Sequence, residues 1–344
     1  MSSRSWFSRA VVAWYDEGHR DLPWRATRDP YRIWLSEVIL QQTRVDQGLP
    51  YYRRFVARYP TVGQLAAASE EQVLKLWQGL GYYSRGRNLL AAAQQVVRAH
   101  GGSFPDRHGA LLALKGVGDY TAAAIASIAF GEAVPVVDGN VYRVLGRVFG
   151  IATPIDSTLG RKEFRALAAT LVDPERPGDH NQAVMELGAT VCTPKGPACD
   201  RCPVSRRCVA RKEDRIDLLP VKGRRTPPRH RHFNYLWIER DEGLLFARRG
   251  AGDIWQGLHE MPLIASDTAL GARALKARAG TRALVRLAGP IDHQLSHQRI
   301  TATLWKAAPG TAAGVPGAWT AVPRDRVHEL PLHRLMEKLL DGLL

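Results

Sequence analysis

Two neighbouring stretches decide how the sequence folds: LKGVGDYTA at residues 114–122 and VVDGNVYRVLGR at residues 136–147. In the first stretch, Gly116 and Gly118 precede a helical pattern. A glycine turn that feeds a helix presents backbone N–H groups and the positive end of the helix dipole, and both favour a phosphate. In the second stretch, Asp138 ends an apolar run and occupies the N-cap position of the next helix. The pair predicts an anion site with a carboxylate beside it.

The composition bounds the class of protein. The 344 residues are enough for two domains with their own cores. The chain has 48 Lys and Arg against 33 Asp and Glu, a formal charge of +15, and the sequence pI is about 10.0. An excess of this size favours a polyanionic partner, above all nucleic acid. A basic protein without such a partner is the alternative. A membrane surface is disfavoured because no long, lysine-rich amphipathic pattern occurs.

The N-terminal sequence sets the expected compartment. Residues 1–10 are polar and contain arginine, and Asp16 and Glu17 follow, which is unlike a secretory or transit peptide. No apolar run approaches the length of a membrane span. We therefore expect an intracellular, cytoplasmic protein without membrane association.

The hydrophobic periodicity divides the chain into three parts. Helical spacing recurs through residues 1–215 and predicts an all-α domain. The expected helices include 4–18, 31–42, 70–77, 85–100, 106–114, 120–130, 141–149, 159–171 and 180–191. Residues 216–232 are basic and rich in proline, which predicts a linker. Residues 233–344 combine short β-forming segments (233–238, 243–247, 283–287, 300–306) with helical patterns at 267–279 and 332–344, so a smaller α+β domain is expected.

The cysteines predict a metal centre. All four lie close together in the spacing C-x6-C-x2-C-x5-C, as Cys192, Cys199, Cys202 and Cys208. Four neighbouring thiols in an intracellular chain are typical of a metal site rather than of disulfides. The x2 pair alone does not separate a tetrahedral zinc from an iron–sulfur cluster.

Glu37 and Asp138 are the candidate pair of catalytic acids. Glu37 lies on an apolar helical stretch, where poor solvation raises a carboxyl pKa and lets it hold a proton near neutral pH. Asp138, at a helix start, is favoured in its ionised form. Taken singly, each has a structural alternative: a buried ion pair for Glu37 and a simple N-cap for Asp138. Together, a protonated acid and a fixed anion suit an oxocarbenium-like transition state, as in glycosidic bond hydrolysis.

These motifs together resemble the endonuclease III superfamily of DNA glycosylases. LKGVGDYTA resembles its helix-hairpin-helix (near 112–125), VDGNVYRVLGR its catalytic segment, and the cysteine spacing its 4Fe–4S loop (192–208). Within it, LSEVILQQTRV (35–45) and GLGYYSRGRNL (79–89) closely resemble the MutY-type adenine DNA glycosylases, and the match runs over residues 1 to about 215. The resemblance implies base excision repair: hydrolysis of the N-glycosidic bond of adenine mispaired with 8-oxoguanine or guanine, on double-stranded DNA, with a 4Fe–4S cofactor.

The resemblance also implies a role for each catalytic residue. Glu37 would protonate adenine at N7, and Asp138 would stabilise the sugar cation. Asn140 and Tyr120 would position these groups and the sugar. Bifunctional relatives carry a lysine where this chain has Tyr120, for Schiff-base chemistry, so a monofunctional glycosylase is expected.

The DNA contacts implied by the resemblance form a second set. The adenine must be flipped out, because the attacked bond is inaccessible inside a duplex. Gln42 and Tyr82 would then enter the stack near the oxidised guanine, and Gly116 and Gly118 would present N–H groups to a phosphate. The other expected DNA contacts near them are Thr43, Arg44 and Arg85.

The C-terminal part is similar to the MutY C-terminal domain, a Nudix-like fold that reads 8-oxoguanine. The Nudix catalytic pattern is absent, which disfavours pyrophosphate hydrolysis. HQLSH at 293–297 approximates the family's Phe-Ser-His loop, with Leu295 in place of the phenylalanine. Ser296 and His297 can still hydrogen-bond a base or a phosphate.

Three other functions remain open at this point. A thymine-glycol or mismatch glycosylase of the same superfamily would act on pyrimidines instead of adenine. A basic, cluster-bearing module could bind DNA without catalysis, and a Nudix-type hydrolase is the weakest alternative. The expected enzyme is a monomer, associated with DNA in the bacterial nucleoid.

Overall fold

The computed structural model describes residues 5–223, 227–252, 254–308, 311 and 318–344. Backbone contacts divide the chain into two compact units: Met1–Ala66 with Ala91–Arg225, and Ala67–Leu90 with Thr226–Leu344. Segment Ala67–Leu90 therefore groups with the C-terminal unit, whereas the sequence pattern includes it in domain 1–215. Among the described residues, no helix combines the length and the apolar character needed to cross a bilayer.

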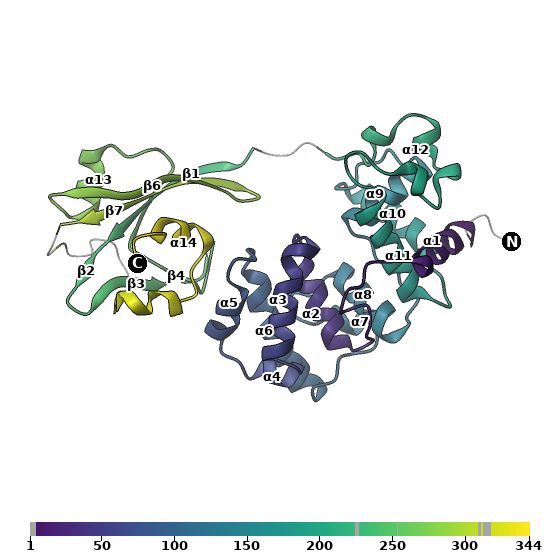
Figure 1. Cartoon of the computed structure of the whole chain (residues 1–344), viewed down its shortest axis with the longest axis horizontal. Coiled ribbons are helices and arrows are strands. Elements are labelled where there is room, and N and C mark those ends of the chain that lie inside the picture. The colour runs from purple at the N-terminus through teal and green to yellow at the C-terminus, as the bar shows by residue number, and fades with distance from the viewer. Residues whose placement is uncertain (1–4, 224–226, 253, 309–310, 312–317) are drawn as a thin grey trace. The chain divides into compact units, whose positions relative to one another are not determined.

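The first unit is helical, as the sequence predicts (Figure 1). Its longer helices are α1 (Ser5–Glu17), α2 (Pro30–Leu40), α3 (Val45–Arg58), α8 (Asp119–Phe130), α9 (Gly139–Phe149), α10 (Thr158–Leu171) and α11 (Pro177–Thr190). The short ones are α4 (Val62–Ala66), α7 (His108–Leu111) and α12 (Val209–Lys212), and the 3-10 turns are η1 (Cys199–Arg201), η2 (Ser205–Arg207) and η3 (Ile216–Leu218). Helix α6 (Ser84–His100) runs from the second unit into the first.

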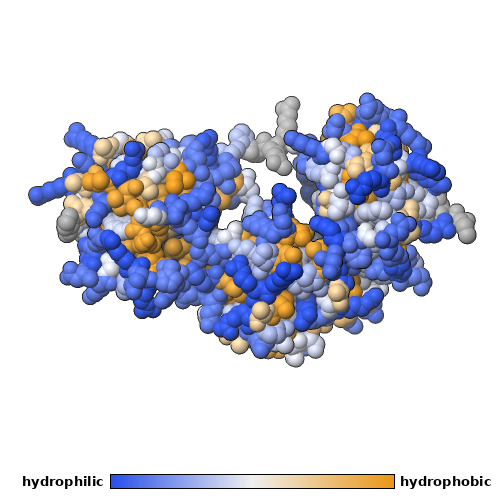
Figure 2. All heavy atoms as spheres, in the orientation of Figure 1, coloured by the Kyte–Doolittle hydropathy of each residue, from blue (hydrophilic) through white to orange (hydrophobic). Residues whose placement is uncertain are grey.

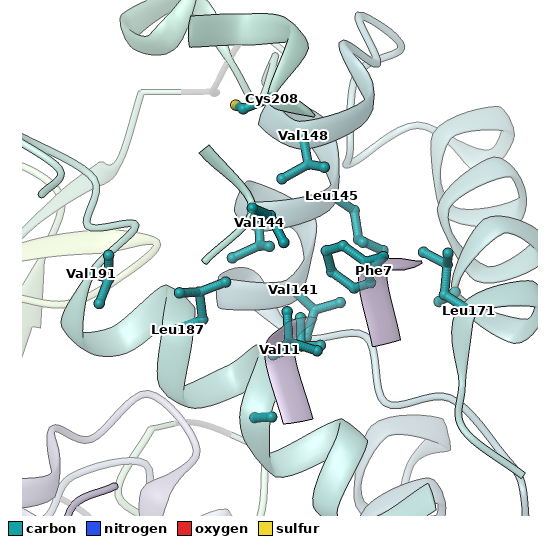
Figure 3. Packing of buried hydrophobic residues seen from close by; sticks show 14 of the residues in the cluster. Phe7, Val11, Val141, Val144, Leu145, Val148, Leu171, Leu187, Val191 and Cys208 are labelled. Carbon is teal, nitrogen blue, oxygen red and sulfur yellow. The ribbon is translucent and has the colours of Figure 1, made fainter. Parts of the chain in front are cut away.

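Helix α9 is a central element of one hydrophobic cluster in the first unit. Val141, Val144, Leu145 and Val148 recur at helical spacing and are all buried. Figure 3 shows them packed with Phe7 and with later residues such as Leu171, Leu187 and Val191. A continuous apolar stripe of this kind fixes the rotation of a helix about its axis. The polar end of α9, which begins with Asp138 and Asn140, is thereby held in one orientation.

A glycine lets α11 approach the start of α9. A Cβ built on Gly188 would lie 2.6 Å from the Asn140 Cβ and 3.1 Å from its Cα. Only a residue without a side chain permits this backbone approach. The contact therefore places Asn140, one of the predicted catalytic residues, against the backbone of α11.

The second unit contains α5 (Glu70–Trp77) and two four-stranded sheets. The first sheet has the order β5-β1-β7-β6, built from β5 (Leu263–Ser266), β1 (Arg229–Trp237), β7 (Gln298–Ala307) and β6 (Leu284–Gln294). The parallel pair β1–β7 lies between antiparallel neighbours. The second sheet has β2 (Glu239–Arg240), β3 (Gly243–Arg248) and β4 (His259–Glu260) in that order, and β8 (Thr320–Val322) also pairs with β3. This α+β unit confirms the expected fold class.

Two helices cover the first sheet. Alternate residues of β1 face opposite ways: Phe233 and Tyr235 share a core with α14 (Arg334–Leu340), and Leu236 shares one with α13 (Ala272–Ala279). The 3-10 turn η4 (Arg324–Glu329) precedes α14. Figure 2 shows hydrophilic side chains over most of the visible face of the molecule, between smaller hydrophobic patches.

The expected linker and helix limits need correction. Arg229–His232 were assigned to the linker 216–232, but they form the first residues of β1 and pair with β7. Residues 216–218 form η3, and 224–226 lie outside the described residues. Cross-strand pairing overrides the basic and proline-rich composition here. The two C-terminal helices are shorter than the patterns 267–279 and 332–344 indicate.

Candidate active site

A cavity of about 160 Å³ in the first unit brings the predicted catalytic residues together. Its lining includes Glu37 from α2, Tyr120 from α8, and Asp138 and Asn140 at the start of α9. Thr43, which follows α2, lines the same cavity. These five residues come from positions about a hundred residues apart in the sequence but line one cavity. The cavity is large enough to hold a flat heterocyclic ring.

Helix α2 carries Glu37 into this cavity. The helix starts with an Asp29 side chain that accepts the Tyr31 N–H at 2.9 Å, and Pro30 occupies its first turn. Almost every following side chain is buried, and Glu37 itself is 7% exposed. At the other end, the Gln41 Nε2 donates to the Thr121 Oγ1 at 3.1 Å and so ties α2 to α8.

Burial gives Glu37 the protonation behaviour of a general acid. Removal from water raises the pKa of Glu37 from 4.5 to about 7, and the nearby Asp138 charge adds to the rise. The Tyr120 hydroxyl donates a hydrogen bond to the Glu37 Oε2, which opposes the rise together with the positive charge of Arg25. At neutral pH, Glu37 is therefore poised between its protonated and ionised forms, as proton donation requires.

Asp138 is held by hydrogen bonds to both carboxylate oxygens. Its Oδ1 accepts the Val141 N–H at 2.7 Å as the N-cap of α9, and its Oδ2 accepts from the Asn140 Nδ2 at 2.9 Å. Burial raises the pKa of Asp138 above its ordinary value, while these bonds and the Arg143 charge lower it. The N-cap thus favours the anion, as the sequence predicts, but burial outweighs it, and the net effect is a raised pKa.

Two arginines that share one glutamate form another part of the cavity wall. Arg20 and Arg25 line the cavity, and both guanidinium groups bind the Glu186 carboxylate. Burial raises the pKa of Glu186, but the hydrogen bonds from Arg20 and Arg25 outweigh it and bring this pKa down to about 2. The group fixes the loop between α1 and α2 against α11.

Sequence reasoning missed these arginines and two residues of α11, Gln182 and Met185. Gln182 is 8% exposed and lines the cavity. The Tyr120 hydroxyl lies 3.6 Å from the Met185 Sδ. Gln182 and Met185 are hard to identify from the sequence. They lie three positions apart on an apolar helix, and this spacing is equally typical of ordinary core packing.

The predicted DNA contacts of the first unit lie at its surface. Gln42 is exposed and adopts φ +54°, in the left-handed region that favours glycine. The Arg44 side chain is 86% exposed. Gly116 (φ +73°) and Gly118 are also exposed, and Gly118 is the N-cap of α8 without a capping side chain. These positions leave backbone and side-chain donors accessible to a ligand.

The Arg85 side chain contacts the loop that precedes it. Its Nη2 donates to the Gly81 carbonyl at 3.2 Å, and its guanidinium lies over the rings of Trp77 and Tyr82. Burial lowers the pKa of Arg85 to about 10. In this structure the Arg85 side chain thus supports Tyr82, which is 44% exposed and has φ +47°, and the expected contact of Arg85 with DNA stays a prediction.

A larger pocket of about 750 Å³ lies within the second unit. It is lined by the predicted lesion contacts Tyr82, Ser296 and His297, and also by Leu295. Ser296 and His297 are exposed at the turn between β6 and β7, where the Leu295 N–H donates to the Gln298 carbonyl at 2.8 Å. This turn presents both polar side chains to the pocket.

The four cysteines surround a separate hollow in the first unit. Cys192 follows α11, and Cys199, Cys202 and Cys208 lie around the turns η1 and η2. Among the described residues, no group of three or more His, Cys, Asp or Glu side chains converges on a single ion position. Val144, Val148 and Leu187 provide the apolar wall of this hollow.

Helix α9 joins the cysteine loop to the cavity. The Arg143 guanidinium donates to the Asn140 Oδ1 and to the Cys192 carbonyl, each at 2.7 Å. One turn further along, the Arg147 Nη1 donates to the Thr193 carbonyl at 2.8 Å. The loop that carries the thiols is thus bonded to the same helix whose first residues face the cavity.

The fold and the two sites define a class of protein: a helical domain with a glycine turn, an N-capping acid and a four-cysteine loop, joined to an α+β domain. Residues 35–169 match the HhH-GPD superfamily of base excision DNA repair proteins, and residues 234–342 match the NUDIX domain. The human adenine DNA glycosylase is 50% identical over 226 residues, which cover 63% of this chain and 41% of that protein. An adenine DNA glycosylase of Buchnera aphidicola is 33% identical, covering 68% of this chain and 70% of that protein. The chain therefore belongs to the MutY-type family of adenine DNA glycosylases.

Two solved structures resemble more than half of the chain. A thermostable thymine-DNA glycosylase is 31% identical, with a TM-score of 0.56, and the alignment covers 61% of this chain and 97% of that one. An endonuclease III bound non-covalently to DNA is 21% identical, with a TM-score of 0.53, covering 62% and 99%, and supports the fold alone. The chain spans less than half the length of the mammalian and Arabidopsis relatives that it matches.

Proposed function

We propose that this protein is a monofunctional DNA glycosylase that removes adenine mispaired with 8-oxoguanine or guanine. One observation carries the proposal: Glu37 and Asp138 line the same cavity, and the pKa of Glu37 is raised to about 7. The names of the human, Arabidopsis and Buchnera relatives, each an adenine DNA glycosylase, support adenine as the excised base.

The cavity residues suit the two halves of the reaction. Protonated Glu37 donates its proton to N7 of the flipped adenine, which turns the base into a good leaving group. The C1′–N9 bond then breaks, its electron pair leaves with adenine, and the sugar becomes an oxocarbenium ion. The carboxylate of Asp138, held by Asn140, stabilises that cation until water adds to C1′ and releases a proton. The products are free adenine and an abasic site.

Tyr120 supports the monofunctional assignment. The side chain donates its hydroxyl hydrogen bond to Glu37, and burial holds the pKa of Tyr120 well above its ordinary value, so it stays neutral. No lysine lines the cavity in the described part of the chain. A Schiff base with the sugar needs a lysine amine at this place.

Duplex DNA is the proposed partner of a monomeric enzyme. Gln42, Thr43 and Arg44 together with the turn of Gly116 and Gly118 supply its contacts in the first unit. Tyr82, Ser296 and His297 line the pocket of the second unit, where we place the oxidised purine. The excess of Lys and Arg supplies the non-specific attraction to phosphates.

We further propose a 4Fe–4S cluster as the resident cofactor. Cys192, Cys199, Cys202 and Cys208 would hold it, because they border one hollow with an apolar wall and four cysteine thiolates are the ligand set of such a cluster. When bound, the cluster cross-links the loop that Arg143 and Arg147 attach to α9.

The test is single-turnover base release from a panel of duplexes. We expect adenine release opposite 8-oxoguanine, slower release opposite guanine, and none opposite cytosine or thymine. Release of pyrimidines without release of adenine would overturn the proposal. Borohydride in the same reactions checks the monofunctional claim, since efficient trapping of the enzyme on DNA would require an amine nucleophile.

Thymine is the second candidate base. The 31% identical structure is a thymine-DNA glycosylase, so the helical fold itself accommodates either chemistry. Thymine opposite guanine is therefore included in the panel. Release of thymine at a rate equal to or above that of adenine would favour this alternative.

A further inference from the structure

Trp255 occupies a strained backbone position beside the pocket of the second unit. Its φ is +60°, in the left-handed region that bulky side chains rarely adopt. One face of its indole ring lies parallel to the His333 ring, with centroids 3.8 Å apart and planes at 10°. Phe233 meets it edge-on, with centroids 6.2 Å apart. Strain of this kind persists where the surroundings fix a residue, and it concentrates at functional sites.

The His333 ring supports one face of the Trp255 indole and is itself held rigidly. It is completely buried, and its Nδ1 accepts the Met336 N–H at 3.1 Å as the N-cap of α14. Burial, with the charges of Arg249 and His293, lowers the pKa of His333 well below its ordinary value, so the imidazole is neutral. Its Nε2 lies 3.4 Å from the Tyr235 Oη. Both ring nitrogens are therefore engaged, and the ring cannot rotate away from Trp255.

Arg249 fixes the turn that contains Trp255. Its Nε donates to the Ile254 carbonyl at 2.8 Å, and its own carbonyl accepts the Gly257 N–H at 2.9 Å. The guanidinium pairs with Glu260, and the two side chains are 9% and 12% exposed. An ion pair this well buried is strongly directional. Arg249 thus bonds to Ile254, which precedes Trp255, through its side chain, and to Gly257, which follows Trp255, through its backbone.

The Trp255 side chain also borders the pocket, beside the His293 ring, whose centroid lies 5.8 Å away with the two planes at 59°. The residue is partly exposed and lines the volume of about 750 Å³ together with Tyr82, Ser296 and His297. This volume is within the range of pockets that enclose a small ligand, and a nucleobase fits easily. Leu295, at the tip of the adjoining turn, supplies no aromatic ring. The indole of Trp255 is a larger ring than the phenol of Tyr82, which is the more exposed of the two side chains.

We propose that Trp255 is the platform on which the nucleobase opposite the excised adenine stacks, with His333 as its positioning residue. The inference rests on the proposed function and names how its second pocket holds the purine. Stacking a base on an aromatic ring contributes a large share of binding energy whatever the base. Ser296 and His297 then supply hydrogen bonds to the base edge, which stacking alone cannot provide.

The experiment measures the affinity of the full chain for two duplexes that both carry a non-hydrolysable adenine analogue. In one, 8-oxoguanine lies opposite the analogue; in the other, an abasic site does. Trp255→Leu is expected to weaken binding to the 8-oxoguanine duplex on the order of 10-fold or more. It should leave binding to the abasic duplex unchanged, because no base is present to stack.

Two further variants separate stacking from folding. Trp255→Phe keeps a ring and should retain most of the affinity. His333→Asn keeps a good N-cap for α14 but removes the supporting ring, so it should weaken binding to the 8-oxoguanine duplex alone. Circular dichroism melts of each variant verify that the second unit is folded.

Two results would overturn the proposal. One is equal weakening on both duplexes, which would assign Trp255 to packing only. The other is unchanged binding of Trp255→Leu and His333→Asn to the 8-oxoguanine duplex. A wild-type protein that releases no adenine, yet loses 8-oxoguanine binding in Trp255→Leu, would contradict the proposed function while supporting the platform.

Discussion

The substitution Glu37→Gln should raise the free energy of unfolding, relative to that of the wild type, more at pH 8 than at pH 5. This is expected even though it removes the proposed catalytic acid. The native carboxyl has a pKa of about 7 against 4.5 for its ordinary value. Below pH 4.5 the carboxyl is protonated in both the folded and the unfolded chain. Burying it therefore does not require burying a charge. As the pH rises from 4.5 to 7, the unfolded carboxyl ionises first, and stability is lost.

The size of this loss follows from the pKa difference. At about 1.4 kcal/mol for each pH unit, the interval from 4.5 to about 7 corresponds to roughly 3 kcal/mol of unfolding free energy. Glutamine has no proton to lose and can still accept the Tyr120 hydrogen bond. The difference in stability between variant and wild type should therefore grow by up to about 3 kcal/mol between pH 4.5 and pH 8, and most of that growth falls between pH 5 and 7.

Urea unfolding followed by circular dichroism measures this difference at pH 5, 6, 7 and 8. Glu186→Gln is the matched control, because the pKa of Glu186 is lowered to about 2 by Arg20 and Arg25 despite its burial. Its stabilising pairs are present at every pH above 5, so this variant should show a loss that does not vary over the range. A Glu37→Gln difference that is equally flat would refute the raised pKa.

Three further predictions test other parts of the structure. Gly188→Ala should reduce the rate of base release with little effect on DNA binding, because its Cβ would meet Asn140 at 2.6 Å and displace the start of α9; an unchanged rate would disprove that coupling. Cys199→Ser should remove visible absorbance from the iron-containing protein and weaken DNA binding more than chemistry, whereas a colourless, zinc-containing wild type would contradict the cluster. Duplex affinity should fall steeply between 50 and 200 mM salt, as expected for about six or more phosphate contacts; a flat response in filter-binding assays would argue against duplex DNA as partner.

The helical fold was predictable because its local signals agree with its packing. Periodic apolar residues, glycine stops and the Asp138 N-cap all point to the same helices, and α5 occupies the expected residues 70–77. The strand β1 was harder, because pairing with β7 includes Arg229–His232, which composition assigns to a linker. Short strands such as β4 and β8 carry almost no pattern of their own, since partner strands define them.

The candidate site was predictable to the extent that its residues stand out locally. A lone carboxyl on the apolar helix α2 and an acid at a helix start are visible in one dimension. Gln182 and Met185 are not, because only the packing of α11 turns them toward the cavity. The contacts of Arg85 with the Gly81 carbonyl and the Tyr82 ring were equally invisible, because a basic residue in sequence does not reveal what its side chain packs against.

The most direct test of the central claim is the pH dependence of adenine release in single turnover, from a duplex with adenine opposite 8-oxoguanine. If buried Glu37 donates the proton, the rate should fall about tenfold for each pH unit above pH 7. On the acid side the rate should also fall, where Asp138 takes up a proton and loses the charge that stabilises the sugar cation. Glu37→Gln should bind the same duplex and release no adenine. A rate that stays constant to pH 9, or base release by Glu37→Gln, would contradict the account.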